Sequence, residues 1–334
     1  MLLIRLPAHG DETLERVWIR TGGRLHLGQL DLNGSLGRLY GGLGVAIAEP
    51  QFEVTAEKSE SLSLHCPDCE TERVWAIAIQ YLKHYGFPGA KIELLDPLPS
   101  HSGLGSGTSL ALALGFAITR VYGAQPSLTE LAGITEREGS RSGIGVAAFE
   151  QGGFLIDGGR PGCDGAPRQR PSVPPLLLRV PFPEDWAILL AMPRSGKTFG
   201  AQEEHAFRSL PPMDAEVSGA ICRLVLMKLL PGLVERDLQS FGQAVTGIQE
   251  YVGGYFAPVQ GGPYASARAA SIAEYMLSQG VVGVGQSSWG PTVYGFIQTG
   301  QQAELLEKLR NQVGDDGLVW ATSGRNQGAS WGWR

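Results

Sequence analysis

A glycine-rich loop that runs directly into an apolar helix is the feature that most constrains how this chain can fold. Residues 97–109 read Pro-Leu-Pro-Ser-His-Ser-Gly-Leu-Gly-Ser-Gly-Thr-Ser, and an apolar stretch over 110–118 follows. Glycines let backbone N–H groups approach an anion, and the first turn of a helix offers unpaired donors at the positive end of its dipole. The loop therefore predicts a phosphate site in which Ser106, Thr108 and Ser109 add hydroxyl donors and cap the helix. Taken alone, the loop is also compatible with an ordinary capped turn before a core helix.

Two other phosphate motifs do not fit the chain. No β-α-β unit with the expected acidic residue follows the loop, which excludes the dinucleotide fingerprint. The run Arg-Ser-Gly-Lys-Thr at 194–198 is not a Walker loop, because Ala191 stands where that motif requires its first glycine.

Three separated blocks resemble the signatures of the GHMP superfamily of galacto-, homoserine, mevalonate and phosphomevalonate kinases. The loop resembles its Pro-x-x-x-Gly-Leu-Gly-Ser-Ser motif, with Gly107 in place of the second serine. Residues 285–293, Gly-Gln-Ser-Ser-Trp-Gly-Pro-Thr-Val, resemble the third motif, which closes over the phosphate loop. Residues 140–147 resemble the stretch that reads Ser-Gly-Ile-Asp in mevalonate kinases, with Gly145 in place of the aspartate. That carboxylate helps to activate the attacking hydroxyl in the kinases, and glycine has no side chain for this role.

A narrower resemblance connects most of the chain with the family of β-ribofuranosylaminobenzene 5′-phosphate synthases of tetrahydromethanopterin biosynthesis. It rests on the blocks 20–38, 41–44, 141–159, 287–292 and 325–329. The resemblance implies a pentosyltransferase that joins 5-phosphoribosyl-1-diphosphate to 4-aminobenzoate or 4-hydroxybenzoate, releases CO2 and diphosphate, and requires no ATP. Loss of CO2 restores the aromatic ring without removal of a ring proton, which is consistent with the missing aspartate. Catalysis then depends on positioning and on electrostatic stabilisation of the leaving group and the sugar cation.

The resemblance also implies an α+β, GHMP-type fold of two domains. Residues 1–165 are expected to form a ribosomal protein S5 domain 2-like half with the phosphate loop, and 175–334 a ferredoxin-like half. Glycine, proline and arginine accumulate between them, over 158–175. Periodicity in the first half predicts strands at 17–27, 45–48 and 92–95, a helix at 74–85 with Trp75, Ala78, Ile79 and Leu82 on one face, and a helix at 128–138 capped by Ser127.

The second half has the order of a β-α-β-β-α-β unit. We predict strands at 186–192, 281–284, 293–297 and 318–321, and helices at 215–230, 265–277 and 302–313.

The resemblance and the residue types together give a set of candidate site residues. The diphosphate is expected on Gly103, Leu104, Gly105, Ser106, Gly107 and Thr108, with Ser287 and Ser288 closing from the other domain. Arg24, His26, Asp31 and Arg141 are the candidate catalytic residues, and Arg38, Trp289, Gly290 and Arg325 the candidate substrate-binding residues. Guanidinium groups suit this role because they bind phosphate or carboxylate in bidentate fashion. Mg2+ is expected with the diphosphate, on Glu150 or Asp157.

Several alternatives remain open at this point. His26 faces away from Leu25 and Leu27 on its strand and is either catalytic or a satisfied structural histidine. Asp157 is equally well a turn residue, and Trp289 either stacks on the aromatic acid or only packs. A true ATP-dependent kinase with a base from elsewhere, and a ligand-binding regulator without turnover, are the competing functions.

Composition bounds the class of protein. A length of 334 residues suits two domains, and a net charge of −6 argues against a nucleic-acid or membrane-surface binder. No signal segment and no run of about 18 apolar residues is found, so a cytoplasmic enzyme acting on small molecules is expected. Whether it is a monomer or a homodimer stays open. Cys66 and Cys69 make one close pair without the second pair of a zinc site.

Overall fold

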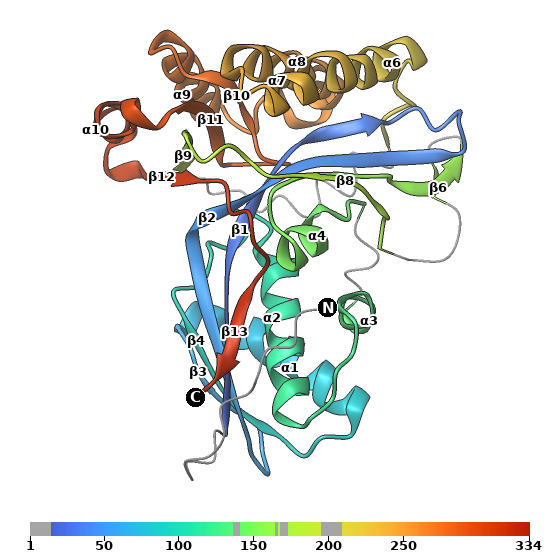
Figure 1. Cartoon of the computed structure of the whole chain (residues 1–334), viewed down its shortest axis with the longest axis vertical. Coiled ribbons are helices and arrows are strands. Elements are labelled where there is room, and N and C mark those ends of the chain that lie inside the picture. The colour runs from blue at the N-terminus through green and yellow to red at the C-terminus, as the bar shows by residue number, and fades with distance from the viewer. Residues whose placement is uncertain (1–14, 136–140, 164–165, 168–172, 195–208) are drawn as a thin grey trace.

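The computed structural model describes residues 15–135, 141–163, 166–167, 173–194 and 209–334, in which two β-sheets carry helices on their faces (Figure 1). The N-terminal segment, Ser140, part of the predicted linker and most of the run at 194–198 lie outside these residues.

The first sheet contains nine strands built around one long antiparallel pair. β1 (Arg16–Asp31) and β2 (Arg38–Lys58) form this pair, and the main path runs in the order β13-β1-β2-β4-β3. The other strands are β3 (Ser63–His65), β4 (Ala90–Leu95), β5 (Phe154–Asp157), β6 (Arg160–Cys163), β7 (Ala166–Pro167), β8 (Leu176–Val180) and β13 (Ser330–Trp333). The predicted strands at 17–27 and 45–48 are therefore parts of two much longer strands.

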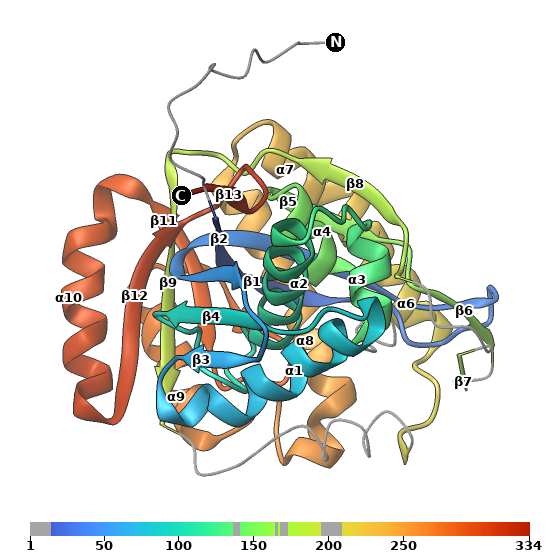
Figure 2. The same ribbon diagram turned by 90° about the horizontal axis from the view of Figure 1, so that it is seen from below.

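Helices α1 (Thr71–Tyr85), α2 (Ser106–Val121), α3 (Leu128–Ile134) and α4 (Ile144–Glu150) gather beside this sheet (Figures 1 and 2). Ser127 caps α3 as predicted, since its Oγ accepts from the N–H of Glu130 at 3.1 Å. The predicted face of α1 is wrong at Trp75, whose side chain is 45% exposed. Val74, Ala78 and Tyr81 form the buried face instead.

The second sheet has the predicted ferredoxin-like order. Its strands are β9 (Trp186–Pro193), β10 (Val282–Gln286), β11 (Val293–Gln298) and β12 (Gly317–Ser323), arranged β10-β11-β9-β12 with antiparallel neighbours. Helix α10 (Gln302–Val313) connects β11 to β12 and lies at the outer edge in Figure 2. Short helical turns η1 (Asp68–Glu70), η4 (Thr299–Gln301) and η5 (Gly314–Asp316) complete the connections.

A layer of helices lies at the top of Figure 1, partly over the second sheet and partly over β1 of the first. It comprises α6 (Ala215–Leu224), the π-helical turn η3 (Val225–Leu229), α7 (Leu230–Val234), α8 (Leu238–Gln260) and α9 (Ala267–Ser278). The sequence analysis missed α8, because four glycines and Pro258 interrupt its apolar pattern. Packing stabilises it: Phe241, Val245 and Ile248 are fully buried.

The continuous helical stretch Ala215–Val234 is long and apolar enough to cross a membrane by length and composition, although two basic residues interrupt it. A third of its most apolar window is buried against the rest of the chain. The sequence analysis expected no segment long and apolar enough to span a membrane, and this helix is one by length and composition.

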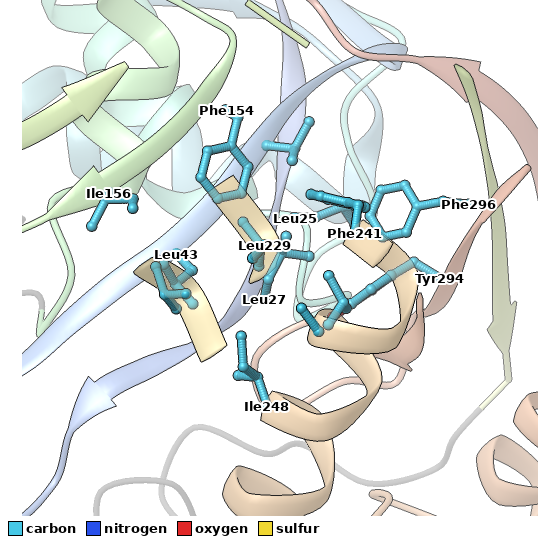
Figure 3. Packing of buried hydrophobic residues seen from close by; sticks show 14 of the residues in the cluster. Leu25, Leu27, Leu43, Phe154, Ile156, Leu229, Phe241, Ile248, Tyr294 and Phe296 are labelled. Carbon is cyan, nitrogen blue, oxygen red and sulfur yellow. The ribbon is translucent and has the colours of Figure 1, made fainter. Parts of the chain in front are cut away.

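One hydrophobic core joins the two halves. Figure 3 shows Leu25 and Leu27 of β1 beside Phe241 of α8 and Tyr294 of β11, which belong to a single buried cluster. Strands also cross the predicted division, because β8 pairs with β5 and the C-terminal β13 returns to pair with β1. The expected boundary in the chain therefore does not separate the two sheets.

Candidate functional site

Helix α2 begins without a side-chain cap. Its N-cap is Gly105, in the left-handed region at φ 76°, and no side chain accepts from the first turn. The predicted capping by Ser106, Thr108 or Ser109 is wrong, because a left-handed glycine turns the chain sharply at this point. The N–H groups of the first turn therefore face outward as donors for an anion.

Arg24 lies directly over this helix start. Its N–H donates to the carbonyl of Leu104 at 2.9 Å and its Nη1 to the carbonyl of Gly103 at 2.6 Å. A Cβ atom on Gly105 would lie 3.1 Å from Cγ of Arg24. Strand β1 thus holds a guanidinium beside the open helix terminus, where its charge adds to the helix dipole.

The third motif closes on the loop from the second sheet. Ser287 is fully buried, and its Oγ donates to the carbonyl of Gly103 at 2.7 Å while accepting from the N–H of His26 at 3.0 Å. The N–H of Thr292 donates to the carbonyl of Ser102 at 3.3 Å. Gly290 follows with φ 71° and precedes a cis proline. Three sequence blocks that are far apart in the chain therefore meet around one loop, as predicted.

His26 is buried and neutral. Burial, with the nearby charge of Arg24 as a smaller cause, lowers the pKa of His26 from 6.5 to about 3. Its Nδ1 accepts from the N–H of Gly28 at 3.3 Å, so the proton of the neutral ring is on Nε2. A side chain with this pKa is not a general base near neutral pH, but it is a permanent hydrogen-bond donor.

A pocket adjoins the loop at this point. His26, Ser288 and Trp289 line it, together with Phe256 of α8 and Gln286 of β10. Trp289 and Phe256 meet edge to face with ring centroids 5.1 Å apart. The predicted residues His26, Ser288 and Trp289 are thus brought together in one concave site, whereas the wall from α8 had no counterpart in the predicted helices.

Gly145 lies in the first turn of α4, against α2. A Cβ atom on Gly145 would be 3.1 Å from Cγ2 of Thr108. The position where the related kinases have a carboxylate is thus next to the phosphate loop and filled by the threonine side chain.

Asp157 has an internal role. Its carboxylate is fully buried and accepts from Ser142 Oγ at 2.9 Å and from the N–H groups of Gly143 and Gly159, both at 2.8 Å. Glu150 is exposed at the opposite end of α4. These two carboxylates therefore do not share a metal site, and the described part of the chain contains no cluster of three or more His, Cys, Asp or Glu residues suited to a metal ion.

Two further candidate site residues, Asp31 and Arg38, make contacts within the protein. Asp31 accepts from the N–H groups of Asn33 and Gly34 in a turn at the end of β1. Arg38 donates to the carbonyls of Gly158 and Gly159 at 2.7 and 2.9 Å.

Arg325 donates to Thr21 Oγ1 and to the carbonyls of Ala148 and Gln327, and burial lowers its pKa to about 10. It remains charged at neutral pH and ties the end of the chain to the first sheet. Arg141 lies half-buried just before α4. The ligand-binding roles of these residues stay predictions.

The sequence analysis missed one basic residue at the phosphate loop. Arg73 of α1 donates to Ser106 Oγ at 3.3 Å and to Ser100 Oγ at 2.5 Å. It also pairs with the buried Glu70 at 3.0 Å. No motif signals Arg73, because only the packing of α1 against α2 brings it to the loop.

Comparison with known proteins agrees with this geometry. Residues 72–153 match the GHMP kinases N terminal domain, and residues 229–315 match the GHMP kinases C terminal domain. Homoserine kinase from Cytophaga hutchinsonii superimposes with a TM-score of 0.67 at 17% identity, covering 98% of this chain and all of the other. A mevalonate kinase gives a TM-score of 0.65 at 14% identity over 93% of this chain and 99% of the other. These two similarities concern the fold alone. The fold and the phosphate loop define the class as GHMP.

Curated relatives narrow the class. Beta-ribofuranosylphenol 5'-phosphate synthase from Archaeoglobus fulgidus is 37% identical over 93% of this chain and 97% of its own length. The Methanocaldococcus jannaschii protein of the same name is 34% identical over 93% of this chain and 98% of its own length. The chain belongs to the beta-ribofuranosylphenol 5'-phosphate synthase family. The resemblance noted from the sequence is thereby confirmed, with the phenol in place of the aminobenzene in the name.

Proposed function

We infer that this protein is a synthase that joins 5-phosphoribosyl-1-diphosphate to a para-substituted benzoate, in methanopterin biosynthesis. The observation that carries the inference is the meeting of Arg24, Ser287 and the uncapped start of α2 around one loop, with no carboxylate at Gly145. Such a site holds a polyphosphate and stabilises it as it leaves, but it lacks the kinase base at its usual position.

The reaction needs little proton chemistry from the protein. The ring carbon that bears the carboxylate attacks C1 of the ribose, and diphosphate leaves with the electron pair of its bond to C1. The bond to the carboxylate then breaks, CO2 leaves, and the electron pair of that bond restores the aromatic ring. The protein's tasks are to orient two substrates and to stabilise the departing diphosphate, which suits donors fixed before the reaction.

The donor set favours Mg2+ arriving with the diphosphate. Asp157 uses both carboxylate oxygens within the protein, and Glu150 is remote from it. We therefore place any Mg2+ on the substrate oxygens, as this ion commonly retains waters and phosphate ligands. The sugar diphosphate is a metabolite of the cytoplasm, and we place the reaction there.

The test is release of labelled CO2 from carboxyl-labelled 4-hydroxybenzoate or 4-aminobenzoate in the presence of phosphoribosyl diphosphate and Mg2+, with and without ATP. Release that requires the sugar diphosphate but not ATP is the expected result. Consumption of ATP with a small alcohol, and no CO2, would instead identify a kinase. Ligand binding without any product would identify a regulator.

A further inference from the structure

We propose that the pocket beside the phosphate loop is the subsite for the aromatic acid, and that Nε2 of His26 selects a para hydroxyl over a para amino group. The inference deepens the proposed function and rests on it.

The pocket has the walls that an aromatic ring requires. Val252, Phe256 and Trp289 supply apolar and aromatic surface. Phe256 and Trp289 are 5% and 6% exposed, so their rings are held in place by the surrounding packing.

Two glutamine side chains that line this pocket, those of Gln249 and Gln286, are already engaged by the protein. Gln249 donates through Nε2 to the carbonyl of Leu27 at 2.9 Å and accepts through Oε1 from the N–H of Gln286. Gln286 accepts from the N–H of Ala265 at 2.6 Å and donates to the carbonyl of Ser288 at 3.2 Å. These amides shape the pocket, and a ligand would have to break their hydrogen bonds to use them.

His26 is different, because one of its polar atoms is uncommitted. It is 4% exposed, and its Nδ1 and both backbone groups have partners. Within the described residues, Nε2 donates to no acceptor. His26 lines the pocket, so a ligand there can supply an acceptor for Nε2, and a hydrogen bond of this kind contributes about 0.5–1.5 kcal/mol. The lowered pKa of His26 fixes this nitrogen as a donor over the working pH range.

A donor that cannot become an acceptor distinguishes the two acids. The oxygen of a phenol accepts a hydrogen bond readily. The nitrogen of an aromatic amine is a poor acceptor, because its lone pair is delocalised into the ring, and its N–H groups would oppose the N–H of His26.

The pocket is also placed correctly for the reaction. Ser288 lines it, and the neighbouring Ser287 donates to Gly103 of the phosphate loop. The pocket therefore shares the third motif with the loop on which the sugar diphosphate is expected, and a ring bound there would lie next to the sugar. No cationic side chain lines the pocket among the described residues to stabilise the carboxylate that must be lost.

The experiment compares kcat/KM for 4-hydroxybenzoate and 4-aminobenzoate, by CO2 release, in the wild type, His26→Gln and Val252→Ala. The wild type is expected to favour the hydroxy acid by about tenfold or more, the size of one buried hydrogen bond. In His26→Gln the ratio falls at least tenfold, because a glutamine amide can turn its oxygen toward the amine. The control Val252→Ala changes the wall without changing its polarity and lowers both values alike.

Equal use of both acids by the wild type, or an unchanged ratio in His26→Gln that still binds phosphoribosyl diphosphate, would overturn the proposal. A second measurement needs no variant and no turnover: binding of phenol and of aniline to the wild-type protein, followed by tryptophan fluorescence. Phenol is expected to bind about tenfold more tightly, and equal binding would count against His26. CO2 release from neither acid would contradict the proposed function, whereas the two binding constants would still test the pocket.

Discussion

The starts of helices α2 and α4 have the same backbone donors and opposite uses. Just before α4 the buried carboxylate of Asp157 accepts from Ser142 Oγ and from the N–H of the N-cap residue Gly143. At α2 a left-handed glycine leaves the first turn without a side-chain cap, and Arg24 lies beside it. The first terminus is a structural joint, and the second is free to bind an external anion. The source of the negative charge, rather than the helix itself, separates a joint from a site.

The largest expected effect is on the free energy of unfolding, when the buried carboxylate of Asp157 is removed. Asp157→Ala leaves three buried donors without an acceptor and should lower the free energy of unfolding by about 3–5 kcal/mol. Chemical denaturation measures this value. Asp31→Ala is the matched control, because this half-buried turn carboxylate should cost about 1 kcal/mol. A stable Asp157→Ala protein that has lost only its Mg2+ dependence would show instead that Asp157 binds the ion.

At the site, the expected effect is on binding. Arg24→Ala removes a charged donor from the phosphate loop and should raise the KM for phosphoribosyl diphosphate about 10- to 100-fold, which corresponds to 1.5–3 kcal/mol. Steady-state kinetics measures the change. Arg268→Ala is the control, because its guanidinium donates to the carbonyls of Gln312 and Val313 and it is not a candidate site residue. An equal change in KM for both substitutions would contradict the proposal that Arg24 binds the diphosphate at the phosphate loop.

His26 connects the site to pH. Its pKa is about 3 in the folded state and 6.5 without burial. The unfolded chain therefore takes up a proton in the window between these values and the folded chain does not. Stability falls as the pH drops through this window, by up to about 1.4 kcal/mol per pH unit from this group, and is constant above it. The fall in Tm between pH 6.5 and 4 should be smaller in His26→Gln, and identical slopes in both proteins would disprove the assignment.

The smallest expected effect is the coupling free energy between Gly145 of α4 and Thr108 of α2, which tests the contact between the starts of these helices. Gly145→Ala places a methyl group 3.1 Å from Cγ2 of Thr108, and Thr108→Ser removes that atom. A double-mutant cycle on the free energy of unfolding should give a favourable coupling of about 0.5–1 kcal/mol. Additive effects would show that α2 and α4 adjust independently.

The sequence predicted elements where local pattern and glycine chemistry agree. The strands of the second sheet, the Ser127 cap and the loop before α2 all follow from spacing within a few residues of each other. Helix α8 was missed because its glycines oppose helix propensity locally and are required globally. At Gly242, for example, a Cβ atom would lie 2.6 Å from the side chain of Val282.

The residues of the candidate site also divide into those that sequence motifs indicated and those that only the tertiary structure brings together. The sequence blocks named Arg24, Ser287 and the loop glycines as candidates for one site, and the structure places these residues in contact. They gave no sign that Arg73 reaches Ser106, or that Phe256 faces Trp289, because these contacts join segments with unrelated sequence patterns.

By itself, the sequence determined that this chain has a glycine loop before an apolar helix and a glycine at position 145, and hence a phosphate site without a kinase base. Only the tertiary structure decided that Arg24 lies beside the uncapped start of α2, and that the buried Asp157 holds the two residues that precede α4. It also decided that His26 is a neutral donor. Burial and hydrogen-bond partners set these properties, and both depend on residues distant in the chain.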